Sequence, residues 1–179
     1  MQLKEKLAAL QKSKIFLDWK KKNKDSYLAH IFRMFDEANK GIWQFGYYNP
    51  DDTITTFVVE KEKVKEVPEQ EIFRKGRHRL PPLAIGKIKL SFEESLKAAK
   101  ELQEKKYPKH PIMKEIAILQ KLENDQIYNI TFVTQTLGTI NIHLDTETGE
   151  IKSDKFTSLM DIAKFEKGGK DKKDTEYIG

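Results

Sequence analysis

The sequence contains no cysteine among its 179 residues. Without a thiol, the chain can form no disulfide framework, no cysteine-type zinc site and no thiolate nucleophile. Long apolar runs are also missing, since no stretch approaches the roughly 20 residues of a membrane span. Lysines interrupt the leucines near the start, so residues 1–24 do not resemble a signal peptide. We therefore expect a cytoplasmic protein with no membrane partner.

Motifs that carry catalysis are scarce as well. No two of the four histidines, His30, His78, His110 and His143, have the His-x-x-x-His spacing of metal ligands. The chain also lacks a glycine-rich phosphate loop and a Gly-x-Ser-x-Gly nucleophile motif. These absences favour a protein that is not an enzyme and that uses no cofactor and no metal.

Charge is abundant but nearly balanced, with 33 basic and 28 acidic residues and a net charge of +5. Two local clusters are basic: the lysines of residues 20–24, and the stretch that holds Arg74, Arg77 and Arg79. Solvated surface charge is the simplest interpretation of both clusters. The alternative is a surface that contacts nucleic acid, which such proteins build by gathering basic residues on one face.

The first part of the chain, residues 1–24, predicts an N-terminal helix. Leucines from Leu3 to Leu10 recur every three or four residues, with charged residues between them. Phe16 and Trp19 are candidate anchors. The helix is expected to lie at the periphery of the fold or to dock on a partner protomer.

Residues 25–66 predict a helix followed by a hairpin. Leu28, Ile31 and Phe35 lie at helical spacing, which extends the helix to about residue 39. Aromatic and β-branched residues over 42–59, interrupted by an Asn-Pro-Asp-Asp turn, are typical of two paired strands.

The aromatic residues of this hairpin are the main candidates for a binding surface. Alternation along a strand places Trp43, Phe45 and Tyr47 on one face and Tyr48 on the other. The first three are expected to pack beneath the helix. Alternatively, exposed rings beside a basic stretch could stack single-stranded bases, or Tyr48 and a sheet edge could receive a peptide. The candidate surface comprises Trp43, Tyr47, Tyr48, Arg74, Arg77 and Arg79.

Residues 67–86 are interpreted as a linker, because Pro81 and Pro82 fit neither a helix nor a central strand. Order resumes in residues 87–152. Ser91 followed by Glu94 forms a capping box, which starts a helix that Tyr107-Pro108 ends. Three alternating strands are then expected, over 113–121, 126–135 and 139–144. Residues 153–179 are expected to form a short helix and a disordered tail.

A turn follows the third of these strands. Asp145, Glu147 and Glu150 crowd around Gly149, which suggests a cation loop at first sight. Calcium loops need about six oxygen ligands on a longer frame. We therefore interpret the segment as a structural turn in which Gly149 adopts a positive φ.

The string from Leu144 to Ile151, Leu-Asp-Thr-Glu-Thr-Gly-Glu-Ile, together with the helix that begins Leu-Ser-Phe-Glu-Glu-Ser-Leu, resembles the PepSY domain. The resemblance covers residues 87–152. Residues 26–66 look like a second, degenerate copy that lacks the Thr-Gly-Glu turn. The resemblance implies an α+β fold similar to cystatin-like proteins, with a helix packed on an antiparallel sheet in two tandem modules.

PepSY modules carry no catalytic residues, and their proposed roles are the inhibition or chaperoning of peptidases. We therefore expect a non-enzymatic module that binds a protein or a peptide, with a possible peptidase-regulating or chaperone-like role. The alternative is a basic protein associated with single-stranded nucleic acid. Sequence alone identifies neither the polypeptide partner nor the oligomeric state.

Overall fold

The computed structural model, which describes residues 2–71, 80–122 and 125–158, contains one antiparallel sheet of eight strands. The elements are α1 (Gln2–Lys12), α2 (Lys14–Lys22), β1 (Tyr27–Met34), β2 (Ile42–Tyr48), β3 (Thr53–Glu60), β4 (Lys63–Glu71), the 3₁₀ turn η1 (Ile85–Lys87), α3 (Phe92–Lys106), β5 (Ile112–Leu122), β6 (Asp125–Thr134), β7 (Gly138–Asp145) and β8 (Ile151–Ser158). None of the helices in these ranges is long and apolar enough to cross a membrane.

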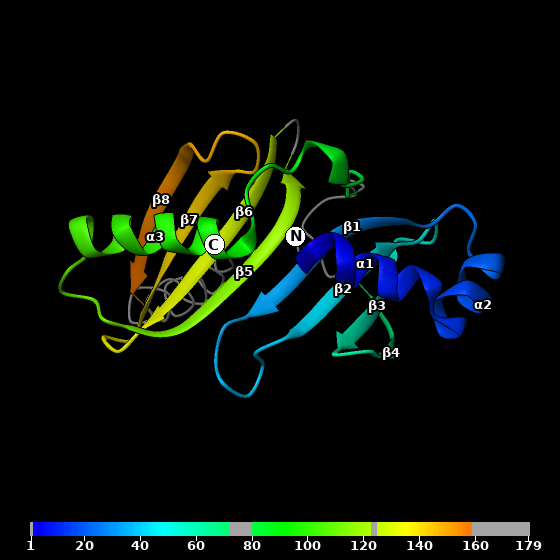
Figure 1. The fold of residues 1–179 in the computed structure, drawn as a ribbon. Helices are drawn as coiled ribbons and strands as arrows, with labels where there is room; N and C mark the ends of the chain where they lie inside the picture. The colour runs from blue at the N-terminus through cyan, green and yellow to red at the C-terminus, as the bar shows by residue number, and fades with distance from the viewer. Residues whose placement is uncertain (1, 72–79, 123–124, 159–179) are drawn as a thin grey trace, which may run out of the picture.

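The strand order is β4-β3-β2-β1-β5-β6-β7-β8, so two four-strand meanders meet at β1 and β5. These two central strands run antiparallel, with His30–Met34 opposite Ile116–Gln120. Figure 1 shows α1 and α2 across the first meander and α3 across the second. The predicted α+β class, with helices packed on an antiparallel sheet, is confirmed. The tandem-repeat interpretation stays a prediction, since a shared order of elements does not show a shared origin.

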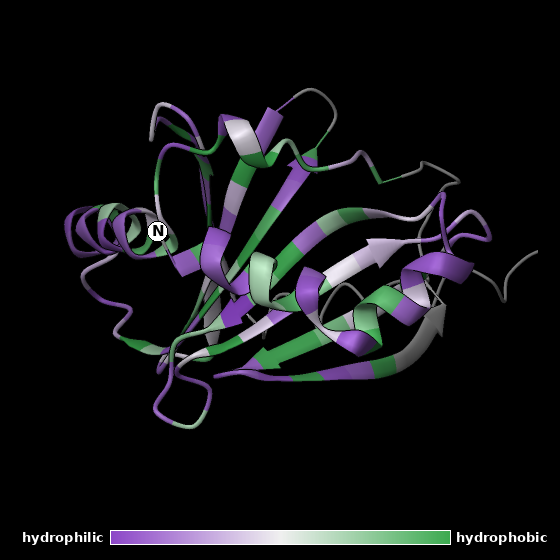
Figure 2. Cartoon of the chain, turned by 45° about the vertical axis from the view of Figure 1, so that its right-hand side comes forward, coloured by the Kyte–Doolittle hydropathy of each residue, from purple (hydrophilic) through white to green (hydrophobic). Residues whose placement is uncertain are grey.

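One hydrophobic core lies between the helices and the sheet. The register aligns a row of buried residues across six neighbouring strands: Phe57, Phe45, Ile31, Leu119, Tyr128 and Leu144. Figure 2, coloured by hydropathy, shows hydrophobic residues alternating with hydrophilic ones along the strands. The helix and strands predicted for residues 87–152 share this core through seven residues: Phe92, Leu96, Ala99, Ile130, Phe132, Ile142 and Leu144.

The helix predicted within residues 25–39 is wrong, because this segment forms β1. A β-bulge explains the misleading spacing. The pairing with β2 shifts between Leu28 and His30, so Ala29 is an extra residue. Leu28 and Ile31, three residues apart, therefore contact the same core, as they would on a helix. In this strand, tertiary pairing on both sides outweighs a local helical pattern.

The N-terminal segment forms two helices instead of one. Ser13 separates them and caps α2, accepting a hydrogen bond from the Phe16 amide (3.2 Å). Phe16 and Trp19 are buried, as expected for anchors, but they pack on the chain's own sheet: each ring lies 5.0–5.3 Å from that of Phe57. Leu17, in contrast, is 47% exposed.

The boundaries predicted on either side of residues 87–152 are also revised. Strand β4 extends to Glu71, and beyond residue 80 the chain packs on the sheet, with the Leu83 amide donating to the Leu28 carbonyl (2.9 Å). Residues 153–158, expected in the loose C-terminal part, form most of β8. Residues 72–79, with Arg74, Arg77 and Arg79, and the helix and tail predicted over 159–179 lie outside the described residues.

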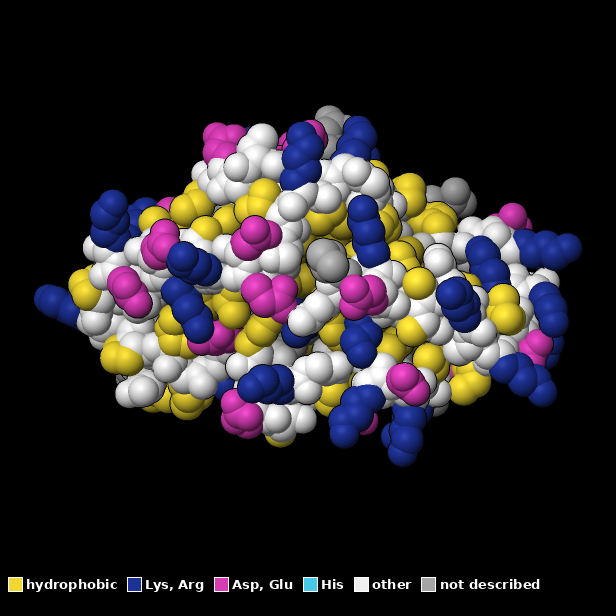
Figure 3. All heavy atoms as spheres, viewed as in Figure 1, with side chains coloured by type: hydrophobic (Ala, Val, Ile, Leu, Met, Phe, Trp, Pro, Cys, Tyr) yellow, Lys and Arg dark blue, Asp and Glu magenta, His cyan; other side chains and the backbone are white. Residues whose placement is uncertain are grey.

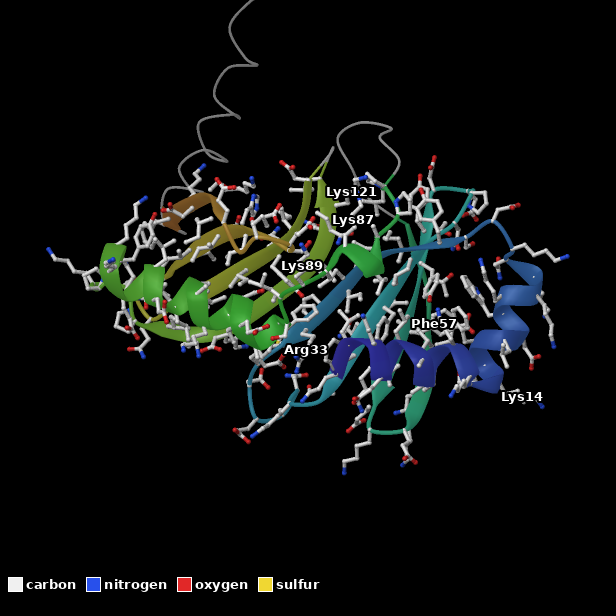
Figure 4. All side chains as sticks on the ribbon, turned by 45° about the horizontal axis from the view of Figure 1, so that its top comes forward. Lys14, Arg33, Phe57, Lys87, Lys89 and Lys121 are labelled. Atoms are coloured by element: carbon white, nitrogen blue, oxygen red, sulfur yellow. The ribbon has the colours of Figure 1, made fainter. Side chains whose placement is uncertain are left out.

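Arg33 on β1 joins the two meanders. Its side chain is 7% exposed, and Nη1 donates to Glu93 Oε1 at the start of α3 (2.6 Å). The guanidinium carbon lies 4.1 Å from the ring centroid of Trp43 on β2 and 5.5 Å from that of Phe92 on α3. Figure 4 shows Arg33 near the start of α3. One buried cation thus contacts a strand of the first meander and the helix that covers the second.

Replacing Arg33 by alanine is expected to lower the free energy of unfolding by about 3 kcal/mol, because the substitution empties a packed site and removes the ion pair. Methionine keeps the apolar volume without a charge, so Arg33→Met is expected to cost less than about 1.5 kcal/mol. Urea unfolding of both variants provides the measurement. Equal losses for alanine and methionine would contradict the packing argument.

Gly149 has a φ of +75°, which confirms the predicted positive value. A Cβ at this position would also meet Leu90 Cδ2 at 3.0 Å. Gly149→Ala is therefore expected to lower the free energy of unfolding by about 1 kcal/mol. Thermal denaturation measures the effect. Gly86→Ala is the matched control, because a Cβ at that position would meet no atom within 4 Å. An unchanged stability of Gly149→Ala would contradict a strained turn.

Candidate functional site: a groove beside an edge strand

The aromatic residues proposed from the sequence as a binding surface are buried. Trp43 and Tyr47 are 1% and 4% exposed and lie in the main core, on the face predicted by alternation. Tyr48 is also 4% exposed and packs in a small second cluster with Leu80. Its hydroxyl donates to Asp52. These rings cannot anchor a partner in this structure, and the arginines grouped with them lie outside the described residues.

Asp145 and Gly149 form a structural turn. Asp145 Oδ1 accepts hydrogen bonds from the amides of Thr148 (2.8 Å) and Glu147 (2.9 Å). These donors, the Thr148 amide above all, hold the pKa of Asp145 below its ordinary value. Across the described ranges, no group of three histidine or acidic side chains is arranged to hold a metal ion.

The two outer strands of the sheet, β4 and β8, each pair with one neighbour. An edge strand presents unpaired backbone groups and can template the addition of another strand. The two edges differ in what lies beside them. On the first meander, α2 contacts β4. On the second, the single helix α3 contacts β6 and β7, and only its last residues and the loop after it reach β8.

A shallow hollow of about 570 Å³ lies along α3 beside Ile151, the first residue of β8, and we call it the α3/β8 groove. It is lined by Ala98, Glu101, Leu102, Glu104, Lys105 and Ile151. The apolar members Ala98, Leu102 and Ile151 are half-buried and pack against the main core. The charged members are exposed and form a rim. Figure 3 shows basic and acidic side chains interspersed over α3.

Polar and aromatic contacts tie the end of α3 to β8. Asp154 Oδ1 accepts hydrogen bonds from Lys106 Nζ (2.6 Å) and from the Tyr107 hydroxyl (2.5 Å). The Lys106 ammonium, followed by the Tyr107 hydroxyl, holds the pKa of Asp154 below its ordinary value. The ring of Phe156 lies 4.0 Å from that of His110. These contacts hold β8 in place beside the groove.

The backbone of β8 presents hydrogen-bonding groups to the outside. The Asp145 amide donates to the Glu150 carbonyl (2.9 Å), which shows that Asp145 directs its backbone towards β8. The N–H and C=O groups of successive residues point to opposite sides of an antiparallel strand. Those of His143 therefore also point towards β8, and those of its partner Ser153 point towards β7. It follows that Asp154 and Phe156 direct their N–H and C=O groups away from β7.

A second cavity, of about 220 Å³, lies between the first turns of α1 and α3. Its polar groups already serve the fold. Glu94 completes the capping box with Ser91, Glu93 pairs with Arg33, and Lys89 pairs with Glu147 (2.7 Å). The cavity therefore offers fewer uncommitted groups to a ligand than the α3/β8 groove.

Comparisons with known proteins give information on the fold and not on the function. No family model matches the chain, and no curated protein matches it. Among solved structures, the chain is similar to a putative lipoprotein from Clostridium difficile 630, with a TM-score of 0.52 and 13% sequence identity. The match covers 80% of this chain and 90% of that one. At this identity the likeness supports the α+β architecture and carries no function across.

Sequence reasoning missed β8 and therefore the groove. The strand reads Ile-Lys-Ser-Asp-Lys-Phe-Thr-Ser, which is polar enough to be mistaken for a loose end. The position of this segment could have revealed the strand, because it follows β7 after a short turn that contains glycine, and such a turn between two segments is typical of a hairpin. Ile151 and Phe156 are the apolar residues that mark its helix-facing side.

The lowered pKa of Asp154 predicts a pH-dependent stability. A carboxyl whose pKa is lower in the folded state stabilises the fold above its unfolded pKa, about 3.9, and loses this effect as the pH falls through the folded pKa. The stability advantage of the wild type over Asp154→Asn should therefore shrink as the pH is lowered from about 5 towards 2. Urea unfolding across this range measures it.

Glu104→Gln is the control, because it removes an exposed carboxylate and leaves the contact between Lys106 and Asp154 in place. A difference between wild type and Asp154→Asn that stays constant with pH would show that this contact contributes no charge-dependent stability.

Proposed function

We propose that the protein is a non-enzymatic module that binds an extended polypeptide as an added strand beside β8. The observation that carries this proposal is the apolar hollow between α3 and an edge strand. In this binding mode, main-chain hydrogen bonds supply affinity and pockets for alternate side chains supply selectivity. The α3/β8 groove offers both kinds of group side by side.

The dimensions suit a short segment. The eight residues of β8 extend over about 27 Å at about 3.4 Å per residue. Every second side chain of an added strand would face the helix side and enter the groove near Leu102 and Ile151. The intervening side chains would face the opposite side of the sheet, beside Ser153 and Lys155. The proposed ligand is therefore a segment with apolar residues at alternate positions.

The resemblance to the PepSY domain supports a peptidase-regulating or chaperone-like role. The bound polypeptide would then belong to a peptidase, or to a protein that the module keeps in an extended conformation. We propose a cytoplasmic setting for it, in keeping with a chain that has no cysteine. Nucleic-acid binding is less well supported. Single-strand binders use exposed aromatic rings, whereas Trp43, Tyr47 and Tyr48 are buried.

Selection from a random peptide library displayed on phage tests the proposal. We expect the selected peptides to alternate apolar and polar residues. Ala98→Arg places a long charged side chain in the groove and should weaken binding at least about tenfold, or about 1.4 kcal/mol. Isothermal titration calorimetry with a selected peptide gives the affinity.

Ala8→Arg, the same substitution at a half-buried alanine of α1, is the matched control and should leave the affinity unchanged. Hydrogen exchange should show slower amide exchange in β8 when the peptide is bound. Binding that resists Ala98→Arg, or protection confined to another strand, would refute the proposed site.

A further inference from the structure

The positive charge of the chain is concentrated in its first two helices. Residues 1–25 contain eight lysines and three acidic residues, Glu5, Asp18 and Asp25, a net charge of +5. This equals the net charge of the whole chain, so the basic and acidic residues balance in the remainder. The excess occurs on the helix side of the first meander, where α1 and α2 follow one another (Figure 1).

Most of these lysines are exposed and are not used by the fold. Within the described part of the chain, the ammonium groups of five make no ion pair or hydrogen bond: Lys4, Lys12, Lys14, Lys22 and Lys24. Helix dipoles account for basic residues in a last turn, such as those that end α2. Lys14 stands at the opposite end of α2, where the dipole disfavours a cation, so it has no stabilising role there.

Two aliphatic side chains are exposed on the two flanks of α2, with the exposed Lys14, Asp18, Lys21 and Lys22 between them. Ile15 and Leu17 are 42% and 47% exposed, on either side of the buried Phe16. Together with the exposed lysines at positions 12, 14, 22 and 24, they form what we call the α2 surface. Figure 3 shows basic side chains with hydrophobic ones between them in this region, and Figure 4 shows Lys14 at the start of α2, next to the end of α1.

We propose that the α2 surface docks on an anionic lipid bilayer, independently of the peptide site. Lysines beside exposed aliphatic residues are the chemistry of peripheral membrane helices, whose apolar side chains enter the interface while the cations remain at the headgroups. The α3/β8 groove lies on the other half of the sheet and would stay open. The sequence-based expectation of no membrane partner rested on the absence of a span, which this mode of binding does not need.

Charge complementarity would also suit a nucleic acid, but the exposed side chains favour lipid. Single-strand binders combine cations with accessible aromatic rings, and the aromatic residues of α2, Phe16 and Trp19, are 6% and 7% exposed. The cations of the surface are all lysine, without the arginine forks that bind phosphates in pairs. Aliphatic groups gain free energy in a bilayer and have no partner on a phosphate backbone.

Sedimentation with lipid vesicles tests the inference. The full chain should bind phosphatidylcholine vesicles that contain phosphatidylserine and should not bind pure phosphatidylcholine. Removing three cations together, Lys14→Gln, Lys22→Gln and Lys24→Gln, should lower the partition coefficient about 100-fold, at about fivefold for each lysine. Leu17→Ser should weaken binding to the same vesicles several-fold without affecting the fold, because the side chain is exposed.

The control removes three exposed lysines of the second half, Lys97→Gln, Lys109→Gln and Lys114→Gln, and should change the partition coefficient much less than the first triple variant does. Equal losses for the two triple variants would overturn the proposed surface, as would an absence of binding to anionic vesicles. Binding to single-stranded oligothymidylate that is lost with the first triple variant, without vesicle binding, would assign the surface to nucleic acid instead. None of these results depends on peptide binding.

Discussion

The structure depends on the antiparallel pairing of β1 with β5, which turns two meanders into one sheet. Five residues of each strand pair directly, and Arg33 reinforces this seam on the helix side. A buried guanidinium is costly to desolvate, and here three aromatic rings and Glu93 surround it. Because residues of both halves make these contacts, neither half can shift without disrupting them. The candidate binding site follows from how the helices cover each half of the sheet.

The coverage of the two halves is unequal. Two short helices, with Phe16 and Trp19 beneath them, cover the first meander as far as its edge strand β4. One helix covers the second, and its flank leaves apolar residues half-buried beside β8. Natural edge strands are protected by charge, proline or cover. At β8 the protection is limited to charged residues such as Lys155 and to the contacts of Asp154, which makes this edge the better template for an added strand.

The second half was predictable because its local signals agree with its tertiary environment. The Ser91–Glu94 capping box forms, the alternation in β6 and β7 matches burial, and Gly149 has the expected backbone conformation. In the first half, the hairpin of β2 and β3 was predicted correctly, but β1 was not, because a bulge at Ala29 gives this strand the three-residue spacing of a helix. The groove itself could not be predicted, since it arises from the distance between α3 and a strand whose sequence is mostly polar.

The central claim is that an extended peptide pairs with β8 and places alternate side chains against α3. Nuclear Overhauser effects between a bound peptide and isotope-labelled protein test it most directly. The account predicts contacts from the peptide backbone to Asp154 and Phe156, and from its apolar side chains to Leu102 and Ile151. Contacts confined to β4, or to the side of the sheet opposite the helices, would contradict it.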